Sequence, residues 1–81
     1  MPTVHKIGSV KIDVYPNDHL PPHFHALYQD HEILVEIRTL ETYAGSLPPR
    51  QYREVIDWAS QEGIQVKLEA MYKRFNPRHY R

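Results

Sequence analysis

The sequence predicts an α+β fold in which an antiparallel sheet of about four strands is followed by two helices packed on one face of the sheet. Three observations support this prediction. The first half of the chain alternates apolar and polar residues in short runs, as half-buried strands do. Two turn signals divide these runs into two hairpins. The second half places apolar residues at helical spacing. The whole chain has 81 residues, which is enough for one domain.

The first predicted hairpin has Gly8-Ser9 as its two-residue loop. Residues 10–15 alternate apolar and polar side chains, which indicates a strand with one buried face. Residues 3–7, which precede the loop, are predicted to pair with this strand. This register places His5 on the apolar face. We therefore expect His5 to be packed against the core and to have a structural role.

The second predicted hairpin joins residues 23–29 to residues 32–38 around the loop Asp30-His31. Counting back from this loop pairs only apolar residues on one face. On the other face it sets His25 opposite Glu36, at the short distance typical of facing strand residues. Glu36 therefore becomes a candidate partner of the histidines, provided that the loop has this length.

Residues 39–45 are predicted as a short irregular or edge segment. Ser46 is then a candidate helix cap, and the prolines that follow suit a first helical turn. The first helix has an apolar stripe of Tyr52, Val55, Ile56 and Ala59, and it stops near Gly63. The second helix has the stripe Ile64, Leu68, Met71, Tyr72 and Phe75, and it ends before Asn76-Pro77. Trp58 falls one position off the first stripe, where we expect it to cover the edge of the core.

Composition excludes several classes of function. The absence of cysteine excludes disulfides, thiol nucleophiles and cysteine-based zinc sites. No stretch is long and apolar enough to span a bilayer, and we expect a cytoplasmic protein that does not associate with membranes. Residues 76–81 are predicted to form a basic tail. The basic residues near this end are candidates for nucleic-acid binding, and the alternative is a solvated helix face: Lys73, Arg74, Arg78 and Arg81.

Three of the six histidines lie within residues 17–25, a segment that a Pro-Pro pair stiffens. His23 and His25 are two apart on a predicted strand, so their side chains leave the same face, and His19 needs only to fold back across the prolines. Imidazoles near their ordinary pKa suit metal binding, proton transfer or anion binding. Asp18 or Glu36 is the candidate carboxylate for completing a metal site or for orienting an imidazole. The alternative is a set of surface histidines that only form hydrogen bonds.

The chain opens Met1-Pro2-Thr3-Val4, continues with N-D-H-x-P-P-H-x-H at residues 17–25, and closes with a helix pair containing tryptophan. These features resemble a family of small bacterial proteins known as domain of unknown function family 4160. The hallmark positions of that family are all present here: Asn17, Asp18, His19, Pro21, Pro22, His23 and His25. His5 stands where the family usually has an apolar or aromatic residue. The resemblance implies a small gene found beside another short gene, as in toxin–antitoxin pairs, and hence a small partner protein encoded nearby.

Two hypotheses of function follow. In the first, the protein is a component of a toxin–antitoxin-like pair in which His19, His23, His25 and Asp18 form the functional site. If it is an enzyme, we expect ribonuclease-like hydrolysis, either by histidines alone or with a divalent ion such as Zn²⁺, Mn²⁺ or Ni²⁺. In the second, the protein is a non-catalytic module that binds its partner through the helix pair or a sheet edge, and a homodimer is a further candidate assembly. A metal that serves structure alone is a third alternative.

Overall fold

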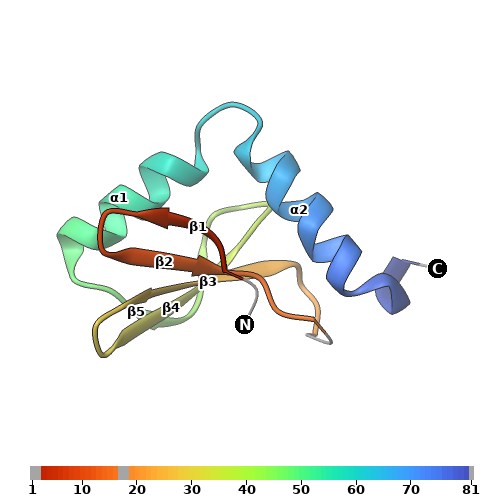
Figure 1. Cartoon of the computed structure of the whole chain (residues 1–81), viewed down its shortest axis with the longest axis horizontal. Coiled ribbons are helices and arrows are strands. Elements are labelled where there is room, and N and C mark those ends of the chain that lie inside the picture. The colour runs from red at the N-terminus through yellow and green to blue at the C-terminus, as the bar shows by residue number, and fades with distance from the viewer. Residues whose placement is uncertain (1–2, 17–18, 81) are drawn as a thin grey trace.

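The computed structural model confirms the α+β fold and describes residues 3–16 and 19–80 (Figure 1). The sheet is an antiparallel meander whose strands stand in chain order. Its strands are β1 (Thr3–Ile7), β2 (Val10–Asp13), β3 (His23–Tyr28), β4 (His31–Glu36) and β5 (Thr42–Ser46). Two helices follow, α1 (Pro49–Ala59) and α2 (Ile64–Phe75), and then a short 3-10 helix, η1 (Pro77–Tyr80). The fifth strand comes from the segment that the sequence predicted as irregular or edge structure.

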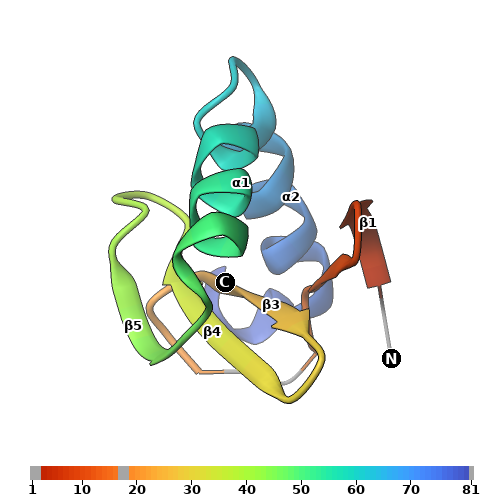
Figure 2. The same cartoon turned by 90° about the vertical axis from the view of Figure 1, so that its left-hand side faces the viewer.

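Both helices lie on the same side of the sheet (Figure 2). The residues of β2, β3 and β4 that face them are apolar and fully buried, and they include Ile12, Phe24 and Val35. The helices contribute Val55, Ala59, Leu68 and Tyr72 to the same core. In the part of the chain that the structure describes, neither helix is long and apolar enough to cross a membrane.

The first hairpin has the predicted loop, because Ile7 pairs with Val10. The prediction for the second hairpin was wrong, since its loop is Gln29-Asp30, one residue earlier, and His31 is the first residue of β4. Each residue of β3 therefore faces a β4 residue two positions away from the predicted one. Gln29 has φ +53°, the positive value that two-residue hairpin loops of the primed types require at this position. A slip of two residues keeps every side chain on its predicted face but changes its neighbour across the strands.

The start of the first helix also differs from the prediction. Ser46 does not cap α1, because it is the last residue of β5 and pairs with Glu32. The helix begins instead at Pro49, which suits a first turn that needs no backbone donor. The second helix ends at Phe75 as predicted, and the chain beyond it continues into η1.

Candidate functional site

The start of the histidine-bearing segment is anchored at Tyr15 and His19 by Tyr72, in the last turn of α2, and by Asn76, which follows the helix. The hydroxyl of Tyr72 donates a hydrogen bond to the carbonyl oxygen of His19. The side-chain amide of Asn76, which is 1% exposed, donates to the carbonyl oxygen of Tyr15 at 3.0 Å. Asn17 and Asp18 lie between these anchors but outside the described residues, so the structure does not test the role predicted for Asp18.

The structure brings the three predicted histidines together in a row, with His23 in the middle. The ring centroid of His23 lies 5.3 Å from that of His19 and 5.2 Å from that of His25. His23 is 1% exposed, the side chain of His25 is 13% exposed, and His19 is exposed. Tyr43 of β5 lies against His19 and His23, and Tyr72 of α2 lies 5.8 Å from His23. These aromatic rings cover the central histidine, which is therefore the least exposed of the three.

Each of the three imidazoles has its Nδ1 atom next to an oxygen acceptor. The acceptors are Leu20 O for His19 at 3.3 Å, Pro21 O for His23 at 2.8 Å and Glu32 Oε2 for His25 at 2.9 Å. A carbonyl or carboxylate oxygen only accepts, so Nδ1 is the donor in each pair. In the neutral ring this fixes the lone pair on Nε2, and it also fixes the ring orientation. The same arrangement is typical of histidines that bind metals or transfer protons.

The carboxylate on His25 is Glu32, and the prediction of Glu36 for this position was wrong. The corrected register sets His25 opposite Leu34, and Glu32 reaches it from the diagonal position. Glu36 instead faces His23 across the two strands. Both glutamates remain on the face that carries the histidines.

A second carboxylate, which the sequence analysis did not single out, lies directly opposite His25 on β2. Asp13 is 0% exposed, and its Oδ2 accepts a hydrogen bond from the hydroxyl of Tyr15 at 3.2 Å and lies 3.8 Å from Lys11 Nζ. The ring of Tyr15 meets that of His25 edge-on, with centroids 4.4 Å apart. The other carboxylate oxygen of Asp13, Oδ1, has no hydrogen-bond partner among the described residues. Burying a carboxylate in this way is costly, which marks Asp13 as part of the site.

One sequence signal for Asp13 existed. The alternation of residues 10–15 puts Asp13 on the face opposite the apolar residues, which is the face of the histidines. The missing information was the pairing of β2 with β3, because the long connection between these strands fixes no register.

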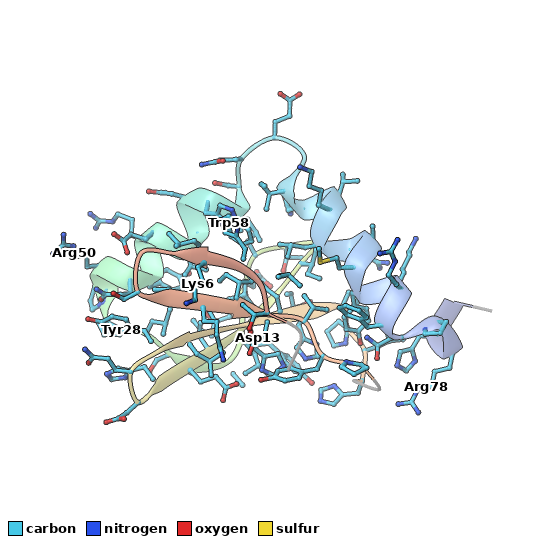
Figure 3. The ribbon with its side chains drawn as sticks, viewed as in Figure 1. Lys6, Asp13, Tyr28, Arg50, Trp58 and Arg78 are labelled. Atoms are coloured by element: carbon cyan, nitrogen blue, oxygen red, sulfur yellow. The ribbon has the colours of Figure 1, made fainter. Side chains whose placement is uncertain are left out.

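The predicted basic residues lie at the end of α2 that holds the histidine segment. Lys73 and Arg74 are exposed in its last turn, and Arg78 is exposed in η1 (Figure 3). Tyr72 links the two regions, because its ring lies 5.8 Å from His23 and stacks at 6.5 Å on His79. Arg81 lies outside the described residues.

The structure contains no preformed metal centre within residues 3–16 and 19–80. No three histidine, aspartate or glutamate side chains in these ranges converge closely enough to hold an ion. The described part of the site is thus a row of imidazoles with carboxylates at Glu32, Glu36 and Asp13 on the same face of the sheet.

Fold and site together define a small α+β protein with a site of histidines and tyrosines at one end of its sheet. Residues 10–78 match the family described as Domain of unknown function (DUF4160), and the chain therefore belongs to that family. The matched region contains the whole described site. Comparisons with curated proteins and with solved structures found no match.

Proposed function

We propose that this protein is the histidine-dependent component of a toxin–antitoxin-like pair and that its histidine cluster hydrolyses RNA phosphodiester bonds. The observation that carries the proposal is the row of three imidazoles, each oriented through Nδ1 by a fixed oxygen. Pairing with a small protein encoded nearby rests on the family resemblance alone.

The exposures of the rings suggest how the work is divided. His19 is exposed and the side chain of His25 is 13% exposed, so they are the groups that would contact a substrate, whereas His23, which is 1% exposed, would position them. One outer imidazole takes the proton of the oxygen that attacks phosphorus. The other, as imidazolium, stabilises charge on the phosphate and gives its proton to the leaving oxygen as the original P–O bond breaks. Lys73, Arg74 and Arg78 would hold the RNA backbone beside them, together with Arg81.

The proposal also has a metal-dependent form. In it, His19, His23 and His25 bind Zn²⁺, Mn²⁺ or Ni²⁺ with Asp18 or Glu36, since imidazole and carboxylate donors suit these ions. The ion would act as a Lewis acid on the phosphate. Binding would require the side chains to close around the ion from their present separation.

The test is cleavage of a labelled RNA oligonucleotide by untagged protein, with the metal content measured by elemental mass spectrometry. We expect His25→Ala to abolish cleavage, and His31→Ala, at an exposed histidine of the β3–β4 hairpin, to leave it unchanged. Cleavage that persists after metal is removed supports the histidine-only form, and cleavage that follows stoichiometric metal supports the other. Intact RNA with wild-type protein, with and without the three ions, would overturn the proposal.

The second candidate function is a non-catalytic module that binds a small partner protein. The observation in its favour is that α2 leaves two apolar side chains in solvent, Val66 at 73% exposed and Met71 at 36% exposed. In that case His25→Ala leaves RNA intact and alters only complex formation.

A further inference from the structure

A mostly apolar groove of about 260 Å³ lies between β1 and the helices, and it shares no residue with the histidine cluster. Its walls include Val4 and His5 from β1, Trp58 from α1, and Lys67, Leu68 and Met71 from α2. The volume is below the roughly 300–1,000 Å³ typical of sites for drug-sized ligands and cofactors. It suits one anchoring side chain of a larger partner.

A β-bulge shapes the β1 wall of this groove. Thr3 pairs with Asp13 and His5 with Ile12, so Val4 is the extra residue between them. Neighbouring residues of a regular strand point to opposite faces, and the bulge allows both Val4 and His5 to line the groove. His5 also stacks on Trp58, with ring centroids 4.7 Å apart and planes 6° apart. The prediction that His5 is packed against the core was wrong, because the residue is exposed and lies in the groove wall.

The edge of the sheet beside this groove is open. Within the described residues, β1 pairs only with β2. Because Ile7 and Val10 close a two-residue loop, they form a hydrogen-bonded pair, and the ladder alternates from there. The backbone N–H and C=O of Lys6 consequently point away from β2, toward the open edge. An extended segment can pair with the sheet at this residue.

The charges around the groove select the partner. Lys67, which is exposed, and His5 line it, and no aspartate or glutamate of the described chain does. Antiparallel pairing of β1 with β1 of a second copy, centred on Lys6, would set two lysines directly opposite each other, which is unfavourable. We infer that the groove binds an extended acidic segment of a partner protein. One apolar side chain enters the groove, and flanking carboxylates reach Lys67.

Trp58 is the only tryptophan of the chain and lines the groove, so its fluorescence reports on binding directly. The probe is the blocked peptide Thr-Glu-Thr-Leu-Thr-Glu-Thr, whose leucine and glutamates share one face when the peptide is extended. We expect saturable binding, weaker on the order of tenfold for Lys67→Glu because that change reverses a charge at the groove. Arg53→Glu, an equally large reversal on the exposed side of α1, should leave the affinity unchanged.

Binding should also slow hydrogen exchange at the backbone amide of Lys6. Equal binding of a peptide with lysines in place of the glutamates would overturn the inference, as would an unchanged exchange rate at Lys6. Trp58 emission that changes with protein concentration alone would assign the groove to a second copy and would equally overturn it. None of these measurements depends on RNA cleavage, so the inference stands or falls separately from the proposed function.

Discussion

Gly45 is the position where a single methyl group should disturb both the fold and the histidine site. It lies in β5 opposite Ile33 with φ +77°, and a Cβ atom there would lie 2.2 Å from the carbonyl oxygen of Glu32. The side chain of Glu32 is the one that accepts the hydrogen bond from His25. Gly63, just before α2, has a similar φ of +85°, but a Cβ there meets nothing within 4 Å. The two glycines therefore have similar backbone conformations but differ in the room that is available for a Cβ atom.

This difference gives the expected free energies of unfolding. Alanine in the left-handed region costs roughly 1–2 kcal/mol, and Gly45→Ala and Gly63→Ala share this term. The clash at Gly45 adds about 1–3 kcal/mol, the usual range for overpacking, because the atom in its way is backbone and cannot rotate aside. A domain of this size loses about 4–8 °C of Tm for each kcal/mol. We expect Gly45→Ala to melt at least about 4 °C below Gly63→Ala.

The assay is thermal unfolding followed by circular dichroism, with the histidine ring resonances recorded by NMR. Tyr43 lies two residues before Gly45, so a displaced β5 should also change the ring contacts of His19 and His23. Their resonances should shift in Gly45→Ala and remain unchanged in Gly63→Ala. Equal melting temperatures for the two variants would refute the reasoning, because the close approach to β4 would then have no energetic effect.

Three further predictions concern the surroundings of the site. Tyr72→Phe removes the donor to the His19 carbonyl and should lower the free energy of unfolding by about 1 kcal/mol in denaturant titrations; an unchanged value would contradict this. Asp13→Asn removes a fully buried charge, so Tm should stay equal or rise while RNA cleavage falls on the order of tenfold; a drop in Tm would show that the carboxylate stabilises the fold. The hydrogen bonds from Arg38 hold the pKa of Glu69 below its ordinary value, so this pair stabilises the protein above that ordinary pKa. Stability should fall as pH drops through the lowered pKa, and Glu69→Gln should remove that part of the acid dependence in melts at a series of pH values.

The elements of the fold could be predicted because their signals are local. The Gly8-Ser9 loop, the alternation around it and the stripe ending at Phe75 each depend on residues close together in the chain. The loop of the second hairpin was predicted at the wrong residues, because residues 29–31 contain no glycine to mark the position of the positive φ that Gln29 adopts. Ser46 was misassigned for a similar reason, since the pairing that makes it part of β5 involves Glu32, fourteen residues away.

The site could be predicted in its histidines but not in their partners. His23 and His25 share a face through strand geometry alone, which holds in any register with the same parity. Glu32, Tyr43 and Asp13 reach the cluster from three different strands, and sequence spacing does not reveal which residues face each other across a sheet.

The distribution of buried polar groups supports the proposal that the functional site lies at the end of the sheet near His23. A domain of this length buries only about 60% of its unfolded surface, so its stability margin is thin. On the face of the sheet that the helices cover, no stability is lost to buried charges, because the sheet residues there are apolar. The polar side chains that are almost completely buried among the described residues are Asp13, His23 and Asn76. Two of them face or form the histidine row, and the third anchors its flanking segment through Tyr15. Local rules of packing are broken in proteins mainly where function requires it, and here the exceptions converge on a single place.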